Sequence, residues 1–333
     1  MYLLLGISLM LALLLVLNLL VSAAATALWR VLAPTAKNWT AQRQAQVIFI
    51  FRIFPLIAVL LVIVALVLPA YFLFEPQSSK EIVSVKLASL AFISTIGVGI
   101  AAYRVFGTWW RTRRLLADWL AHAERIFIDD AKIPVYRIYH PFPVIAVIGA
   151  FRPRMFVARQ VFAALDDKEV GAAIRHEYGH LAARDNLKRS LMRIARDLLV
   201  IPFGRSLDCA WAEKVESAAD EYAARTGGKS AALNLASALV KIARIVPPNT
   251  KPAMPAGAFL IEAPTVDITE RVRHLVNLSE IKVVAAKSPC LNTRNVLWLY
   301  AGGFFVFALL LTANNMILHK IHFALEAVVG ILQ

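Results

Sequence analysis

The segment RHEYGH, residues 175–180, places two histidines four residues apart, with a glutamate directly after the first. On an α-helix His176 and His180 share one face, so both imidazoles can bind the same metal ion. Glu177 lies about 100° further round the helix, close to the metal but free to act on a bound water. This H-E-x-x-H arrangement is typical of zinc peptidases and predicts a hydrolytic Zn²⁺ site. The alternative is an amphipathic helix that carries two exposed histidines.

A catalytic zinc site needs a third protein ligand and keeps one position for water. The segment AEKVESAADEYAARTGG, residues 212–228, offers Glu216 and Asp220, again four residues apart. We expect Glu216 to bind the metal and Asp220 to accept the second ring N–H of a ligand histidine, which fixes its tautomer. Glu213 lies on the same side and is the alternative ligand, although it has no acidic partner one turn later.

The predicted chemistry is hydrolysis of a peptide bond. Zinc lowers the pKa of its water and polarises the carbonyl, while Glu177 moves the water proton to the leaving amine. The developing oxyanion needs a partner, for which Arg271, Tyr178 and His274 are candidates, and we take Arg271 as the catalytic residue. Asp185 either supports the second histidine or is a surface acid.

The elements around these residues are predicted from local signals. Asp166 and Glu169 form a capping-box pattern, so the first metal helix should begin there. The second should end at residues 227–228, GG, and the alanines at 218–219 would let the two helices approach closely. Upstream, residues 113–127 resemble a helix. Residues 134–158 are β-rich, with FRPR as the turn of a hairpin between VIAVIGA and MFVA, and an extended substrate could add as a strand beside either.

The composition indicates a membrane protein. Hydrophobic residues make up 59% of the 333 residues and the mean hydropathy is +0.63, too apolar for an ordinary soluble domain. Four apolar stretches are close to the ~20 residues that cross a bilayer: about 1–29, 54–74, 87–110 and 296–313. The first ends in SAAATA, which resembles a signal-peptidase site, but it has no positive n-region, so we expect a retained helix.

These stretches predict a mainly α membrane protein with four transmembrane helices. Residues 1–110 hold three of them, residues 111–294 form an α+β zinc peptidase domain, and residues 295–333 hold the fourth and a short tail. The first loop carries Arg30, Lys37, Arg43 and Arg52 without an acid, so the positive-inside rule places it in the cytoplasm. The N-terminus is then outside, the catalytic domain is cytoplasmic and the membrane is the inner one. Residues 320–333 would lie on the outer surface as an amphipathic helix.

The net charge of +14 raises nucleic acid as a partner, but the basic residues cluster beside apolar runs, as in WWRTRR at 109–114. That pattern predicts contact with anionic lipid, and no nucleic-acid motif accompanies it. The expected partners are therefore a protein or peptide substrate and the lipid bilayer, with the oligomeric state left open. Cys209 and Cys290 match no metal or disulfide spacing and are expected to be free thiols.

At RHEYGHLAARDN and ESAADEYA the sequence resembles the integral-membrane gluzincins, and most closely the BlaR/MecR-type antirepressor peptidases. Residues 149–186 are similar to that family's stretch from an FRP turn into the zinc helix, and the membrane layout is similar too. The resemblance covers about residues 111–278. It implies a gluzincin-type domain with His176, His180 and Glu216 as ligands and Glu177 as the base. Those sensors carry a penicillin-binding domain after the last helix, whereas this sequence ends at Gln333, so we do not expect direct β-lactam sensing.

The HtpX and CAAX prenyl protease family shares H-E-x-x-H and the E-x-x-A-D pattern of ESAAD. The present sequence differs from that family at residues 263–264, which are Ala-Pro where the family carries His-Pro. Arg271 lies in a sequence context similar to that of the family's arginine. The favoured function is regulated proteolysis or signalling at the cytoplasmic membrane face. The alternatives are quality control of membrane proteins by an HtpX-like protease and a non-enzymatic membrane scaffold that uses the zinc domain for binding.

Overall fold

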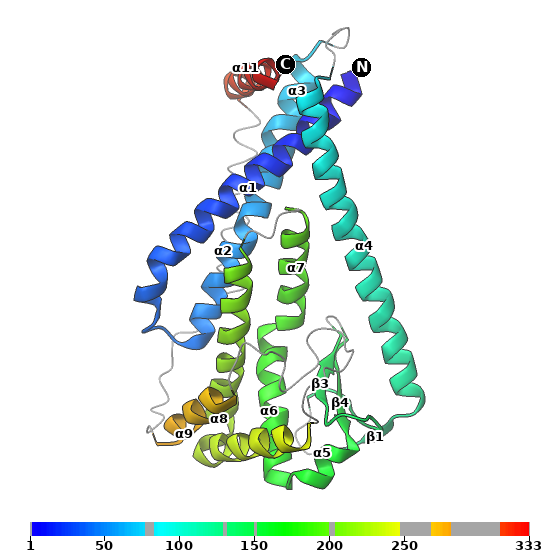
Figure 1. The fold of residues 1–333 in the computed structure, drawn as a ribbon, viewed down its shortest axis with the longest axis vertical. Helices are drawn as coiled ribbons and strands as arrows, with labels where there is room; N and C mark the ends of the chain where they lie inside the picture. The colour runs from blue at the N-terminus through cyan, green and yellow to red at the C-terminus, as the bar shows by residue number, and fades with distance from the viewer. Residues whose placement is uncertain are drawn as a thin grey trace.

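The computed structural model describes residues 2–76, 83–128, 132–149, 152–199, 204–246, 268–280 and 314–332. Within these ranges the chain is mostly helical and holds one small sheet (Figure 1). The predicted fourth membrane segment, residues 296–313, lies outside the described residues.

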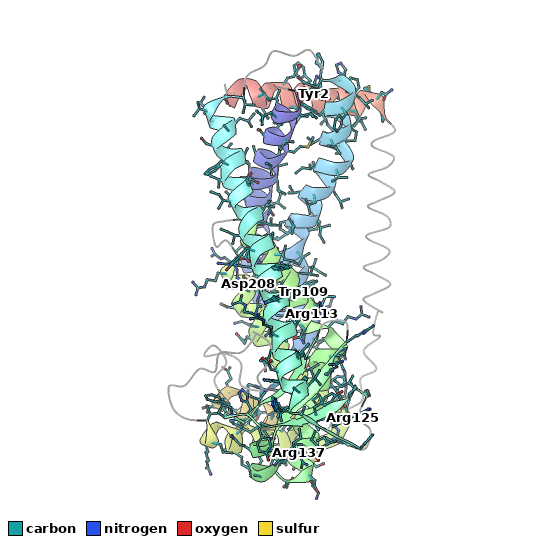
Figure 2. The ribbon with its side chains drawn as sticks, turned by 90° about the vertical axis from the view of Figure 1, so that its right-hand side faces the viewer. Tyr2, Trp109, Arg113, Arg125, Arg137 and Asp208 are labelled. Atoms are coloured by element: carbon teal, nitrogen blue, oxygen red, sulfur yellow. The ribbon has the colours of Figure 1, made fainter. Side chains whose placement is uncertain are left out.

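Three helical runs are long and apolar enough to cross a membrane. They are α1 (Tyr2–Ala36), the continuous run of α2 (Ala41–Val62), η1 (Ile63–Val67) and α3 (Leu68–Phe74), and α4 (Val85–Ala121). The π-helical turn η1 ends two residues before Pro69, which has no N–H to continue the helical ladder. The three runs lie close together near the chain termini and spread apart toward the domain (Figure 1). Helix α11 (Asn315–Leu332) lies across the narrow end (Figure 2).

Three of the predicted helix boundaries are wrong. The first helix is predicted to end at residue 29, but α1 continues to Ala36 and includes Arg30. The predicted loop residues Arg43 and Arg52 lie inside α2, which begins after Thr40, whose hydroxyl accepts a hydrogen bond from the Arg43 N–H. The N-cap sets this start, thirteen residues before the predicted apolar stretch begins at residue 54. Likewise, residue 110 is no boundary, because α4 continues unbroken from the apolar segment to Ala121.

The domain contains a four-stranded sheet in the order β1-β2-β4-β3. Strands β3 (Ile145–Ile148) and β4 (Arg154–Ala158) form the predicted antiparallel hairpin. Strand β2 (Val135–Ile138) runs parallel to β4, and β1 (Glu124–Ile126) pairs antiparallel with β2. The predicted helix over 113–127 is therefore wrong at its end, because pairing with β2 overrides the helical preference of residues 124–126.

Among the described residues of the domain, five helices follow the hairpin: α5 (Arg159–Ala164), α6 (Asp167–Ala183), α7 (Asp185–Asp197), α8 (Arg205–Ile245) and α9 (Ile268–Glu280). The capping box of Asp166 and Glu169 is present at the start of α6, as predicted. In α8 the helical geometry breaks at Gly228 (φ 77°, ψ −172°), where the first helical run was predicted to end, and a second run continues to Ile245. The domain core joins the sheet to α6 and the second part of α8, with Phe156, Ile145, Ala173 and Leu235 fully buried.

Candidate metal centre

Helices α6 and α8 carry the predicted ligands and pack closely against each other. Gly179 lies in the H-E-x-x-H segment at this contact, and a Cβ added there would come within 2.9 Å of Ala219 Cα. Ala219 belongs to the alanine pair that was predicted to allow close approach. The two small residues bring the histidine face of α6 directly opposite the Glu216 face of α8.

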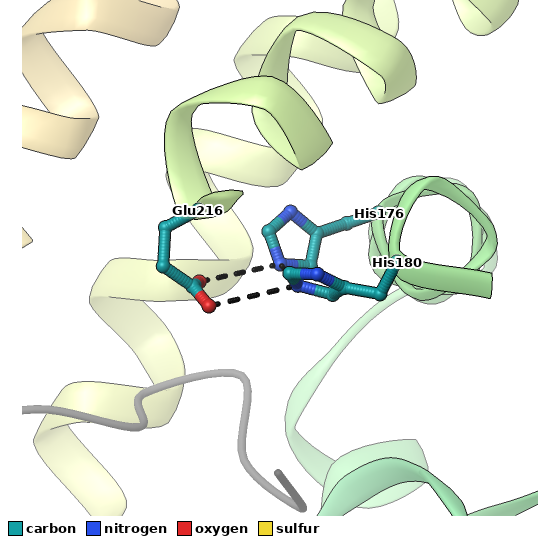
Figure 3. Close-up of side chains that lie close together, drawn as sticks. All are labelled: His176, His180 and Glu216. Atoms are coloured by element: carbon teal, nitrogen blue, oxygen red, sulfur yellow. Dashed lines mark hydrogen bonds and ion pairs between the residues drawn. The ribbon is translucent and has the colours of Figure 1, made fainter. Parts of the chain in front are cut away.

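His176, His180 and Glu216 converge on one point between the two helices (Figure 3). The two Nε2 atoms are 3.1 Å apart, with the imidazole planes at 85°. Each Nε2 is 3.6 Å from an oxygen of the Glu216 carboxylate. Glu213, the alternative ligand, is exposed and pairs with Lys214. The structure thus favours Glu216 as the third donor.

The spacing of these donors fits a metal ion. Two ligand nitrogens at about 2.0–2.1 Å from a tetrahedral metal are about 3.3 Å apart, close to the observed 3.1 Å. Nitrogen and carboxylate donors together suit a divalent transition metal. The three residues can therefore hold one such ion and leave a fourth position for water.

Each ligand histidine has a carboxylate behind it. The Nδ1 of His176 is 2.8 Å from Asp220 Oδ1, as predicted, and the Nδ1 of His180 is 3.0 Å from Asp185 Oδ2. Both acids are buried. A carboxylate in this position fixes the tautomer that presents Nε2 to a metal. The structure therefore assigns Asp185, which the sequence left open, to the site.

Arg271 is buried at the centre of this acid cluster rather than open to solvent. It reaches the site from α9. Its Nε and Nη2 donate hydrogen bonds of 3.0 and 2.7 Å to the two oxygens of Asp220, and its Nη1 lies 3.2 Å from Glu216. The Arg271 guanidinium thus binds both Glu216, the candidate third ligand, and Asp220, the carboxylate next to His176.

The charges of the cluster shift its titration strongly. Burial opposes protonation of His180, but the carboxylates of Glu216 and Asp185 outweigh it and raise the pKa of His180 to about 9. Burial would raise the pKa of Glu216, but His180, His176 and Arg271 lower it to about 2. The pKa of Asp220 is also lowered, chiefly by Arg271 acting against burial. The carboxylates are therefore ionised at neutral pH and ready to bind a cation.

Glu177 is buried on α6 next to the first ligand. Its charge contributes to the raised pKa values of both His180 and Arg271, which places its carboxylate near the ligand cluster. The hydroxyl of Tyr178 accepts a hydrogen bond from the Lys132 backbone N–H. The Nε2 of His274 is buried and has no hydrogen-bond partner in the part of the chain that the structure describes.

The other histidines lie away from this cluster. His140 contacts the backbone of Phe142, and His122 caps the end of α4. His319 and His322 lie on α11 against Phe74, at the opposite end of the molecule (Figure 1). None of them is grouped with the three ligands.

Comparison with known proteins adds no family. No protein-family model, curated protein or solved structure matches this chain. The functional argument therefore depends on the site itself and on the membrane helices.

Proposed function

We propose that this chain is a membrane-embedded zinc endopeptidase that cleaves protein or peptide substrates at the cytoplasmic membrane face. The observation that carries the proposal is the convergence of His176, His180 and Glu216 from two helices, next to the buried Glu177. Structural zinc sites use four protein ligands, whereas hydrolytic sites use three and keep one position open. The motif resemblance to the BlaR/MecR-type gluzincins agrees with this assignment.

In the proposed mechanism side chains of the protein orient the two histidine ligands, and Glu177 transfers the proton. Zn²⁺ held by the three ligands would activate a water and polarise the substrate carbonyl. Glu177 would accept a proton from the attacking water and pass it to the leaving amine. Asp220 and Asp185 hold the two imidazoles with Nε2 toward the metal. Arg271 neutralises the carboxylates that would otherwise repel each other.

The edge strand of the described sheet offers a place for an extended substrate, and Asn186 already donates a hydrogen bond to its Val147 carbonyl. In the described sheet, β4 lies between β2 and β3, so MFVA has neighbours on both sides. Strand β3 lies at the edge and contacts α6. A peptide added beside β3 would lie along the helix that carries the ligands. Of the two strands named from the sequence, β3 is the one we propose for binding.

The topology is also part of the proposal. The three apolar helices indicate a membrane protein. We assign a fourth span to residues 296–313, the N-terminus to the outside of the inner membrane and the domain to the cytoplasm, on the positive-inside rule. The cellular role we favour is regulated proteolysis.

The test compares wild type with Glu177→Gln in the full-length purified protein. We expect both to bind one equivalent of zinc, while the variant loses about 10²–10⁴-fold in cleavage of casein or of itself. Glu213→Gln, an exposed acid on the neighbouring helix, is the matched control and should cleave normally. Equal cleavage by wild type and Glu177→Gln, with both holding metal, would support the scaffold alternative.

Substrate trapping with Glu177→Gln separates the two cellular roles. A single regulator recovered with the trap indicates signalling. A mixed set of damaged membrane proteins indicates quality control.

A further inference from the structure

A large cavity separate from the metal centre lies between α4 and α7. Its volume is about 960 Å³, at the upper end of the range for ligand pockets, roughly 300–1,000 Å³. Helix α4 forms one wall and α7 forms the other, with residues 147–149 of the sheet edge between them (Figure 1). None of the metal ligands lines it.

The walls of this cavity are strongly basic. The one carboxylate among its described lining residues is Asp197, which pairs at 2.6 Å with Arg104 and at 3.4 Å with Arg196. Arg152 lines the cavity beside the sheet edge. The remaining arginines come from both walls: Arg111 and Arg113 from α4, and Arg189 and Arg193 from α7. The cavity therefore carries a large excess of positive charge.

The cavity lies where α4 changes from an apolar to a basic helix. Trp109 lines it, and the guanidinium of Arg113 lies 4.8 Å from the centre of the Trp109 ring (Figure 2). The guanidinium of Arg114 lies 5.3 Å from the centre of the Trp110 ring. Tryptophan and arginine at the end of an apolar helix mark the headgroup level of a bilayer. Apolar side chains, among them Val105 and Ile194, share the walls with the arginines.

We infer that this cavity binds the headgroup of an anionic phospholipid. Guanidinium groups bind phosphate oxygens through paired hydrogen bonds, and two facing walls of arginine can enclose one phosphate. The apolar side chains between them suit the start of the acyl chains. An acidic polypeptide would use the charge but not these apolar walls or their position at the membrane surface. The inference does not depend on whether the metal centre hydrolyses peptides.

Two adjacent residues, Asp185 and Asn186, connect the cavity to the metal site. Asn186 lines the cavity and donates a hydrogen bond of 2.9 Å to the Val147 carbonyl of the edge strand β3. Its neighbour Asp185 orients His180. A lipid in the cavity would therefore lie one residue from the carboxylate that orients a ligand.

The test measures lipid binding to the full-length protein by native mass spectrometry from detergent. The probes are phosphatidylglycerol and phosphatidylcholine with identical acyl chains. One variant, Arg111→Gln/Arg113→Gln, changes the exposed α4 wall, and a second, Arg189→Gln/Arg193→Gln, changes the α7 wall. Arg125→Gln/Arg225→Gln removes two exposed arginines outside the cavity and is the matched control.

We expect wild type and the control to prefer phosphatidylglycerol, and each wall variant to lose roughly 25-fold in its affinity, about fivefold per arginine. Equal binding of both lipids by wild type, or an equal loss in the control, would overturn the inference. So would displacement of the lipid by inorganic phosphate or by polyglutamate at matching concentration, because the site would then bind a free anion or an acidic chain.

Discussion

Two carboxylates orient the two imidazoles, one from each side of the cluster. Asp220 comes from α8 and serves His176, while Asp185 follows the end of α6 and serves His180. Both acids are buried, so a histidine that loses its partner cannot replace it readily with water. The two acids should therefore contribute similarly to metal binding.

The first prediction concerns Asp185. Asp185→Asn should weaken zinc binding about 10–100-fold, because an uncharged amide accepts the His180 Nδ1–H more weakly than the carboxylate that orients Nε2 toward the metal. Competition against a chromogenic chelator measures the affinity. The control is Asp118→Asn, an exposed acid on α4. Unchanged zinc affinity in Asp185→Asn would return Asp185 to a purely structural role.

Arg271 was predicted to stabilise the oxyanion, and its contacts suggest a second role that can be separated from the first. If it positions Asp220 and Glu216, Arg271→Lys should lower zinc affinity, because an ammonium group cannot reproduce the paired hydrogen bonds. Arg271→Gln should also destabilise the fold, by about 3–5 kcal/mol, because two buried carboxylates lose their cation. Zinc titration and kcat at saturating zinc are measured together. Normal zinc affinity with a large fall in kcat would instead support the oxyanion role.

The sequence predicted the candidate metal ligands better than the carboxylates that orient them. His176, His180, Glu216 and Asp220 follow from helical spacing, because i, i+4 pairs share a face. Asp185 did not follow, because position 185 of an uninterrupted helix would face away from His180. The left-handed backbone of Arg184 (φ 56°) ends α6 and redirects the chain, and no glycine marks that turn.

At the scale of elements, the distance between α6 and α8 decides whether the three donors can meet. Gly179→Ala should weaken zinc binding, because its Cβ would lie 2.9 Å from the Ala219 backbone and force the helices apart. We expect at least about a tenfold loss, as for other disturbed ligand supports. Gly171→Ala on the same helix is the control, since its Cβ meets only the end of the flexible Arg175 side chain, at 3.4 Å. Equal zinc affinity in both variants would contradict the role given to this contact.

The start of α6 is tied to α8 by Glu169, and this gives a pH prediction. Its buried carboxylate accepts hydrogen bonds from the Asp166 N–H, Ser237 and Lys241. Burial raises its pKa, but Lys241, Ser237 and the Asp166 N–H lower it below the ordinary 4.5. A lowered folded pKa means that the stabilisation is complete above about pH 4.5 and is lost as the pH falls through the folded pKa.

Glu169→Gln should therefore destabilise the protein by about 1–3 kcal/mol at pH 7. The difference from wild type should shrink below pH 4.5. Thermal unfolding in detergent, followed by tryptophan fluorescence from pH 7 to pH 3.5, measures this. A difference that stays constant across the range would show that the lost interaction is not ionic.

Local sequence signals predicted the elements whose contacts form between residues close in sequence, as in the capping box of α6 and the β3–β4 hairpin. They failed where a distant segment decides. Residues 124–126 follow directly on a long helix, and only pairing with β2 makes them a strand. The contact of Arg271 on α9 with Asp220 could not be predicted for the same reason, because the two residues are 51 positions apart in the chain.

For the whole molecule, the question is how membrane helices and domain hold together. A buried cluster joins α1 and α2 to α7 and α8, with Ile48, Met192, Leu207 and Trp211 among its members. Beside it, Arg52 of α2 is 2% exposed and donates a 2.9 Å hydrogen bond to Asp208 of α8. The sequence around Arg52 does not predict this contact, because its partner lies 156 residues away in the chain. The helix that carries Glu216 is thus fixed to a membrane helix two turns before the ligand.

A double-mutant cycle tests this connection. Arg52→Met and Asp208→Leu should each destabilise the protein, because each leaves a charged group without its partner inside the helix interface. The double variant should be less damaging than the sum, with a coupling of about 0.5–3 kcal/mol. The matched cycle at the exposed pair Glu124 and Arg137 should show no measurable coupling. If zinc affinity falls in the single variants and recovers in the double, α2 positions the Glu216 helix. If stability couples but zinc affinity stays constant, the pair joins membrane helix and domain without affecting the metal centre.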